Sequence, residues 1–195
     1  MRKNWAALAL TGMLCLTTFA GTQTVSAETA DSAKQVDIVF THDTHSHLNT
    51  FTTIVDEAEK EVGGFARINT LIQEQKAKNP DTLVIDGGDF SMGTLIQTVF
   101  ETQAAEIRML GYMGCDVTTL GNHEFDYRSK GLANMLNSAA ESGDDLPAMV
   151  VCNVDWESME AAGLSEGQQL IRDAFDEYGV SDYVVLEKGD TDIAV

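Results

Sequence analysis

The sequence has little positive charge, and this shortage narrows its range of partners. Lysine and arginine together number 12, against 31 aspartates and glutamates, for a formal net charge of −19. So acidic a surface repels nucleic-acid backbones and anionic lipids, so neither is expected as a partner through non-specific charge. It also opposes anionic substrates, unless a local positive charge such as a bound metal ion offsets the field. We therefore expect a small-molecule ligand rather than a nucleic-acid polymer.

Cysteine is also scarce, with three residues in the chain. One lies at position 15, and the pair Cys115 and Cys152 is too small for a disulfide framework. Cys152 falls inside the apolar run 148–154, which predicts a buried small hydrophobe. A single Cys115–Cys152 bridge and two free thiols both stay open.

Long apolar runs are confined to the N-terminus. Arg2 and Lys3 precede an apolar stretch over 5–20, and Val25-Ser-Ala27 places small residues at a cleavage position. This layout predicts a signal peptide over 1–27 and an exported protein, whether secreted, periplasmic or associated with the cell envelope. The alternative is a membrane anchor, but Ala, Thr and Gly dilute the run and no strong stop-transfer pattern follows. We expect no stable membrane insertion once the signal is cleaved.

The rest of the chain, without internal repeats or low-complexity linkers, alternates short apolar strands with amphipathic helices. This order predicts an α/β fold in which a layered sheet has helices at its flanks. The expected strands are 35–41, 82–85, 116–120, 148–154, 183–186 and 191–195, and the expected helices are 65–79, 96–110, 132–139 and 170–178.

Three successive strands are each followed by a polar loop. The loops are His42-Asp-Thr-His-Ser-His47, Asp86-Gly-Gly-Asp89 and Leu120-Gly-Asn-His-Glu-Phe-Asp126. In such sheets the strand ends carry the binding loops at one edge, so the three loops are expected to meet. The simpler alternative is three unrelated polar loops, the last of which merely caps the next helix.

The side chains in these loops suit a divalent metal. Asp43 and His45 are two apart, so on an extended strand end they would point to the same side and bind one ion. A carboxylate with an imidazole suits Zn, Mn or Fe. Asp89, beyond the glycine turn, is the better ligand of its loop, and Asp86 is expected to brace the loop by hydrogen bonds. Asn122 offers a neutral carbonyl oxygen.

The motifs Asp43-x-His45, Gly88-Asp89 and Gly121-Asn-His-Glu124 stand in the order found in calcineurin-like metallophosphoesterases. The fuller strings resemble the exported bacterial 5′-nucleotidase branch, including Gly63-Gly-Phe-Ala-Arg67. The resemblance covers most of 35–154 and resumes at 183–195, whereas 155–182 matches nothing in the family. It implies a four-layer α/β/β/α arrangement in a complete domain.

The resemblance also implies roles. Two divalent metal ions would activate a hydroxide for attack on a nucleotide phosphate monoester. His123 would face the phosphate, and Asp126 would fix its tautomer and orientation. His42 and His47 are weaker ligand candidates. The implied metal ligands are Asp43 and His45 for the first ion, Asp89 as the bridge and Asn122 for the second ion.

The sequence has four histidines, and none follows His123. The family completes its site with later histidines, so we expect 28–195 to be the N-terminal part of a catalytic domain, with weak metal binding and little hydrolysis by itself. Three alternatives stay open. They are a 2′,3′-cyclic nucleotide phosphodiesterase/3′-nucleotidase, a non-catalytic secreted fragment or binding protein, and an amidohydrolase using His45 and His47. The last leaves Asp89 and the third loop unexplained.

Overall fold

A four-stranded parallel sheet organises the part of the chain that the computed structural model describes, residues 35–195. Its order is β1 (Ile38–Thr41), β4 (Leu83–Asp86), β5 (Val117–Thr118) and β6 (Ala148–Met149). Val39 pairs with Val84, Ile85 with Val117, and Thr118 with Met149. These are the first four strands expected from the sequence, although β5 and β6 are shorter than predicted. The predicted signal peptide lies outside the described residues.

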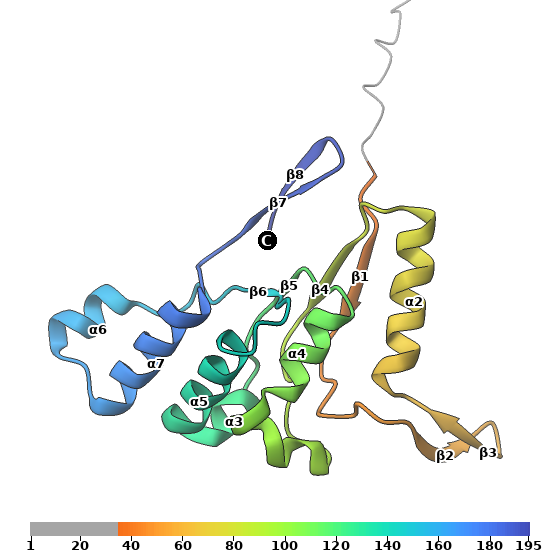
Figure 1. Ribbon diagram of the computed structural model, residues 1–195, viewed down its shortest axis with the longest axis horizontal. Coiled ribbons are helices and arrows are strands. Elements are labelled where there is room, and N and C mark those ends of the chain that lie inside the picture. The colour runs from red at the N-terminus through yellow and green to blue at the C-terminus, as the bar shows by residue number, and fades with distance from the viewer. Residues whose placement is uncertain (1–34) are drawn as a thin grey trace, which may run out of the picture. The chain divides into compact units, whose positions relative to one another are not determined.

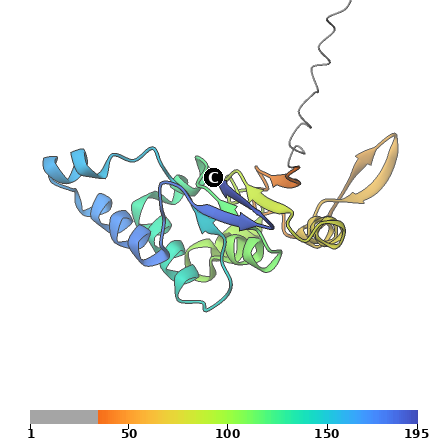
Figure 2. The same cartoon turned by 90° about the horizontal axis from the view of Figure 1, so that it is seen from above.

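Helices cover one face of this sheet (Figures 1 and 2). They are α2 (Phe65–Lys78), α4 (Ala105–Tyr112) and α5 (Arg128–Ala140), with α7 (Glu166–Tyr178) packed against α5. Each turns an apolar stripe inward at helical spacing, as the sequence predicts. The resulting α/β layering confirms the predicted fold class. The fully buried core includes Ile72, Val84, Phe100, Ile107, Leu110, Leu132, Met135, Leu136 and Met149.

The predicted helix over 96–110 is three segments. A 3₁₀ turn, η1 (Leu95–Val99), leads into α3 (Phe100–Gln103), and α4 begins at Ala105. Between them Ala104 has a left-handed backbone, with φ of 47°, and is fully buried. The sequence gives no signal for this break, because alanine is the strongest helix former and favours continuation. The break redirects the chain so that α4 packs against the sheet.

Two further elements were not predicted. The first is the hairpin of β2 (Phe51–Val55) and β3 (Ala58–Val62), which projects away from the sheet and is almost wholly exposed (Figures 1 and 2). The second is the short helix α6 (Trp156–Ala162), which Asp155 caps by accepting a hydrogen bond from the amide of Ser158. Neither segment has apolar residues at a clear helical or strand spacing, so the sequence pattern does not reveal these two elements.

The last two strands, β7 (Val185–Lys188) and β8 (Thr191–Ala194), form an antiparallel hairpin close to the predicted positions. Lys188 ties this hairpin to the sheet through a 2.8 Å ion pair with Asp116. On the sheet itself, Ile38 and Phe40 of β1 are exposed and alternate with the partly buried Val39. The four-layer arrangement of a complete domain stays a prediction.

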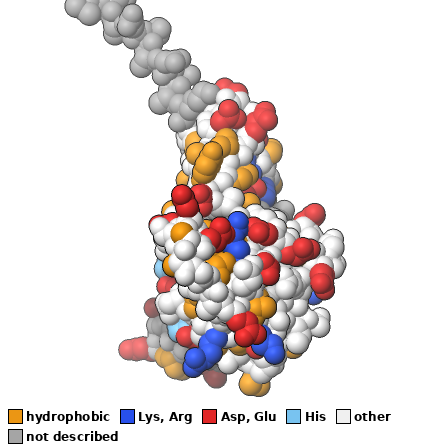
Figure 3. All heavy atoms as spheres, turned by 90° about the vertical axis from the view of Figure 1, so that its left-hand side faces the viewer, with side chains coloured by type: hydrophobic (Ala, Val, Ile, Leu, Met, Phe, Trp, Pro, Cys, Tyr) orange, Lys and Arg blue, Asp and Glu red, His pale blue; other side chains and the backbone are white. Residues whose placement is uncertain are grey.

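The cysteines and the charges can now be placed. Cys115 and Cys152 are free, so there is no bridge between them, and Cys152 is exposed rather than buried as predicted. The observed strand β6 ends at Met149, earlier than the predicted strand over 148–154, so Cys152 lies beyond the sheet. Acidic side chains spread across the face shown in Figure 3, with few basic ones among them. No helix within residues 35–195 combines the length and apolar character needed to cross a membrane.

Candidate metal centre

The three polar loops meet at one edge of the sheet, as predicted. They follow β1, β4 and β5, which are adjacent and parallel. Backbone hydrogen bonds join the first loop to the second, from Asp43 N to Gly88 O at 3.0 Å and from His45 N to Asp89 O at 3.1 Å. The amide of His123 donates to Asp89 Oδ1 at 2.9 Å and joins the third loop to the second. The three loops are therefore in direct contact at this edge, as the prediction requires.

Three side chains converge where the loops meet. Ligand atoms of His45, Asp89 and His123 all lie within 4.8 Å of one another. The two imidazole rings stand edge to face, with centroids 5.0 Å apart. Two nitrogens and a carboxylate oxygen form a donor set suited to Zn, Mn or Fe. The residues present therefore fit a divalent metal ion.

His45 is oriented for such a role by its other ring nitrogen. Its Nδ1 lies 3.1 Å from the carbonyl oxygen of Ser91 and 3.2 Å from that of Met92. A carbonyl only accepts hydrogen bonds, so Nδ1 is the donor, and in the neutral ring Nε2 carries the lone pair. This is the usual way in which proteins fix a metal-binding histidine.

Asp43, another predicted ligand, lies outside the group formed by His45, Asp89 and His123. Asp43 has a φ of 52° and His45 a φ of 45°, so the expectation of an extended strand end here is wrong. The carboxylate of Asp43 is instead 2.9 Å from Nδ1 of His42 and is half exposed. Asn122 immediately precedes the 3₁₀ turn η2 (His123–Tyr127), and its main-chain carbonyl oxygen accepts a hydrogen bond from the amide of Phe125. Their metal roles stay predictions.

His123 and Asp126 form the contact that the sequence predicts. Nδ1 of His123 lies 2.7 Å from Asp126 Oδ2, within one turn of η2. The hydrogen bond to Asp126 raises the pKa of His123, and the charges of Asp89 and Asp126 act in the same direction. The pairing leaves Nε2 of His123 as the nitrogen available to a ligand, an ion or a proton.

Asp86 braces the second loop, as expected. It is almost fully buried, and its carboxylate accepts hydrogen bonds from Thr41 Oγ1 at 2.7 Å, Gly88 N at 3.0 Å and Thr118 Oγ1 at 3.1 Å. Burial raises the pKa of Asp86, while these hydrogen bonds oppose that shift. Because its partners lie on β1, β5 and its own loop, Asp86 ties the strand ends together beneath the ligands.

Glu124 plays a larger part than its sequence position suggests. It is fully buried and accepts four hydrogen bonds from the second and third loops. Oε2 accepts from the amides of Asp89 at 3.1 Å and Gly121 at 2.7 Å, and Oε1 accepts from the amide and hydroxyl of Ser91 at 3.0 and 2.8 Å. Glutamate is among the residues least often buried, so nothing local in the sequence identifies this role.

Two glycines allow the loops to approach closely. Gly88 has a φ of +86°, and a side chain there would place Cβ 2.5 Å from the amide nitrogen of Gly121. A Cβ on Gly121 would lie 2.1 Å from Asp89 Oδ1. Only glycine fits at either position, which explains why both predicted ligand loops contain it.

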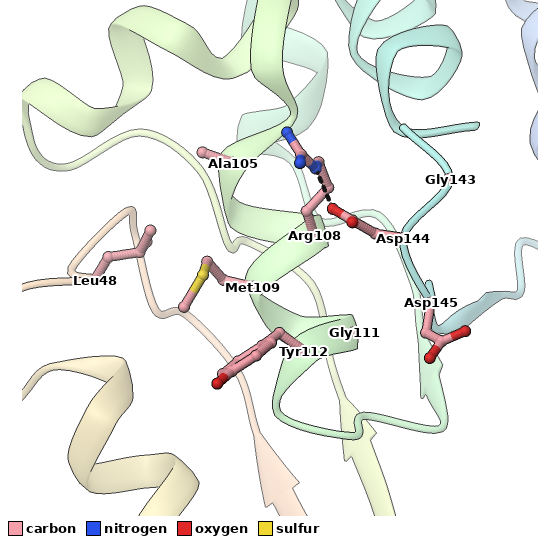
Figure 4. A pocket seen from close by; sticks show the side chains of 9 residues that line it. All are labelled: Leu48, Ala105, Arg108, Met109, Gly111, Tyr112, Gly143, Asp144 and Asp145. Atoms are coloured by element: carbon pink, nitrogen blue, oxygen red, sulfur yellow. Dashed lines mark hydrogen bonds and ion pairs between the residues drawn. The ribbon is translucent and has the colours of Figure 1, made fainter. Parts of the chain in front are cut away.

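A cavity of about 640 Å³ lies beside α4, behind the first loop. Figure 4 shows Met109 extending to the side on which Leu48 lies, while Arg108 points to Asp144 and donates a hydrogen bond to its carboxylate. Its lining includes none of the predicted ligands or catalytic residues. The candidate metal centre is therefore a meeting of surface loops rather than this cavity.

Comparison with known proteins identifies the family. The family model described as calcineurin-like phosphoesterase matches residues 36–190. The chain belongs to this family. A probable 5′-nucleotidase of Treponema pallidum is 34% identical over 107 residues, which are 53% of this chain and 18% of that protein. A 5′-nucleotidase-related protein of Glossina morsitans morsitans is 32% identical over 151 residues, which are 74% of this chain and 26% of that protein.

Solved structures show the same fold. The 5′-nucleotidase precursor of Thermus thermophilus aligns with a TM-score of 0.64 at 24% identity, covering 82% of this chain and 27% of that one. The NAD nucleotidase of Haemophilus influenzae aligns with a TM-score of 0.59 at 24% identity. The alignment covers 82% of this chain and 25% of that one. The chain thus spans about a quarter of the length of these family members.

Proposed function

We propose that the chain forms part of a metal-dependent phosphohydrolase that removes phosphate from nucleotides in the manner of a 5′-nucleotidase. The observation that carries the proposal is the convergence of His45, Asp89 and His123 within 4.8 Å, with His123 paired to Asp126. The family match and the 5′-nucleotidase names of several relatives support the choice of substrate class. The signal-like N-terminus supports export.

The residues divide into metal ligands and one proton carrier, and His123, although it lies in one group with His45 and Asp89, is assigned to the proton. Asp43 and His45 would hold one divalent ion, Asp89 would bridge two, and Asn122 would add a neutral oxygen to the second. Divalent cations bound here would supply a nucleophilic hydroxide and neutralise phosphate charge. They would also offset the repulsion between this acidic chain and an anionic substrate.

His123 would face the phosphate and move a proton through Nε2. Asp126 holds Nδ1 at 2.7 Å and so presents one edge of the ring to the substrate. Oriented groups of this kind contribute about 10²–10⁴-fold to rate. Replacing Asp126 with asparagine should therefore lower turnover more than it weakens metal binding.

The first test is metal binding, which does not depend on turnover. Calorimetric titration of the purified chain with Mn²⁺ should show binding that Asp89→Asn weakens strongly, because a bridging carboxylate loses its charge. Asp145→Asn is the matched control, since Asp145 is exposed and belongs to none of the three loops. Wild-type protein that binds no Mn²⁺ or Zn²⁺ would refute the metal centre and favour a non-catalytic binding protein.

A substrate panel tests the chemistry. The Haemophilus influenzae relative named NAD 5′-nucleotidase, 31% identical over 114 residues, makes a dinucleotide the second candidate substrate. Phosphate release from AMP, products from NAD and opening of a 2′,3′-cyclic nucleotide should be compared with Mn²⁺ present. Metal-dependent release from AMP that His123→Ala abolishes would support the 5′-nucleotidase assignment. Cleavage of NAD or the cyclic nucleotide in preference to AMP would replace it.

A further inference from the structure

A buried hydrogen bond lies directly beneath the first loop. Ser46 Oγ donates to Glu106 Oε1 at 2.7 Å, and both residues are fully buried. Sixty positions separate them in the chain, so the bond joins the loop after β1 to the first turn of α4. Ser46 follows the candidate ligand His45 directly. The pair therefore connects that ligand to a core helix.

Glu106 contributes poorly to stability, which makes its presence informative. Its second oxygen, Oε2, is buried without a hydrogen-bond partner in the described part of the chain. Burial raises the pKa of Glu106, and the charge of Glu124 adds to the shift. A buried polar atom left unpaired destabilises the folded state, so an apolar residue of similar size would serve the core better. The carboxyl group therefore fits a positional role better than a purely stabilising one.

The backbone around Ser46 explains why it needs holding. His45 and Ser46 both lie in the left-handed region, with φ of 45° and 54°. Such a conformation is unfavourable for a non-glycine residue and persists only where surrounding contacts enforce it. The conformation of these two residues sets the direction in which the imidazole of His45 points.

Ser46 is bonded through all of its polar groups. Its amide donates to Phe90 O at 2.8 Å, and its carbonyl oxygen accepts from Thr94 Oγ1 at 2.6 Å. Those two contacts reach the second loop and the segment that follows it. Only the hydroxyl reaches α4, whose Ile107 and Leu110 are anchored in the core. The Ser46–Glu106 bond is thus the link between the strained loop and the core helix.

We propose that Glu106 is a positioning residue, which through Ser46 holds His45 in the orientation needed for metal binding. This inference rests on the proposed metal centre. Glu106 touches neither ligand atoms nor substrate in this arrangement, since its contact is with Ser46. Residues that orient a metal ligand typically change metal affinity about 10–100-fold when they are replaced.

The experiment uses the 195-residue chain and Mn²⁺ alone. Glu106→Leu and Ser46→Ala should each weaken Mn²⁺ binding about 10–100-fold in calorimetric titrations. Glu106→Gln should keep the wild-type affinity for Mn²⁺, because the glutamine oxygen can accept the same hydrogen bond from Ser46. The double variant Ser46→Ala/Glu106→Leu should bind Mn²⁺ no more weakly than the weaker-binding single variant, because both substitutions break the same hydrogen bond. Glu101→Leu is the matched control, because Glu101 pairs with Asn134 at 3.0 Å, away from the loops.

A second readout needs no metal. Nitrogen-15 NMR of the imidazoles should find His45 of the metal-free wild type protonated at Nδ1, the tautomer fixed by the Ser91 and Met92 carbonyls. Glu106→Leu should mix the two tautomers, and Glu106→Gln should not. Wild-type affinity and an unchanged tautomer in folded Glu106→Leu would overturn the inference while leaving the metal centre intact. Wild-type protein that binds no Mn²⁺ would instead remove the metal centre on which the inference rests.

Discussion

Replacing Glu124 with leucine should destabilise the protein severely, and the structure allows the magnitude to be worked out. Leucine leaves three backbone amides without an acceptor, those of Asp89, Ser91 and Gly121. An unsatisfied buried donor costs about 1–3 kcal/mol. The bond to Ser91 is buried and those to Asp89 and Gly121 are part-buried, so about 3–9 kcal/mol is the upper range for the three together. Because domains of this kind are stable by only about 5–15 kcal/mol, the variant should be close to unfolded or have rearranged loops.

Glutamine at the same position should be milder, and its two orientations are not equivalent. If the amide nitrogen replaces Oε2, it faces the amides of Asp89 and Gly121, and two donors lose their acceptor. If it replaces Oε1, it faces the amide and hydroxyl of Ser91, and the hydroxyl can rotate to accept. The second orientation leaves one amide unpaired. Glu124→Gln should therefore cost about 1–3 kcal/mol.

Urea denaturation followed by circular dichroism measures both variants. Glu177→Leu is the control, because Glu177 is exposed on α7, and it should change the free energy of unfolding little. The expected order of stability is wild type and control first, then Glu124→Gln, then Glu124→Leu. A Glu124→Leu protein as stable as the control would refute the argument that this carboxylate holds the second and third loops together.

Three other predictions concern cysteine and glycine. In the folded protein a maleimide should label the exposed Cys152 much faster than the buried Cys115. Peptide mapping by mass spectrometry measures the two rates, and faster labelling of Cys115 would contradict its burial. Burial raises the pKa of Cys115 from 9.0 to about 12, so its contribution to stability is complete below pH 9 and is lost as the pH rises toward 12. Stability should fall by about 1.4 kcal/mol per pH unit over that window, relative to Cys115→Ala, and equal slopes in both proteins would contradict this. Gly93→Ala should displace the first loop and weaken Mn²⁺ binding, because the new Cβ would lie 2.1 Å from the main-chain carbonyl oxygen of His45. Gly143→Ala is the control, because the space around Gly143 is open, and it should leave Mn²⁺ binding unchanged.

The sheet and the meeting of three loops were predictable because they depend on local pattern and on one topological rule. Runs such as 82–85 are β-branched and end in polar residues, and parallel strands place those ends together. Asp86 could be separated from Asp89 for the same reason, since one ends the strand and the other follows the turn. The hydrogen bonds of Asp86 confirm that distinction.

Features that depend on tertiary contacts were not predictable. The burial of Glu106 and Glu124 comes from loops and helices that surround them, and a glutamate in sequence resembles a surface residue. The left-handed backbone at Asp43 was missed because alternation along an extended strand was assumed beyond the strand's end. The exposed Cys152 was missed because β6 ends at Met149, before the apolar run gives any sign of ending.

Two residues with left-handed backbones, in and just after the second loop, limit how far substitution can raise the melting temperature of this fold. Asp89 and Met92 have φ of 53° and 64°, and glycine would relieve strain at either position. At Asp89 the relief would remove a candidate ligand, so thermostability and chemistry compete there. Met92 offers His45 only its main-chain carbonyl oxygen, which glycine retains. Directed evolution toward higher melting temperature should therefore accept glycine at 92 while purifying selection for activity keeps aspartate at 89.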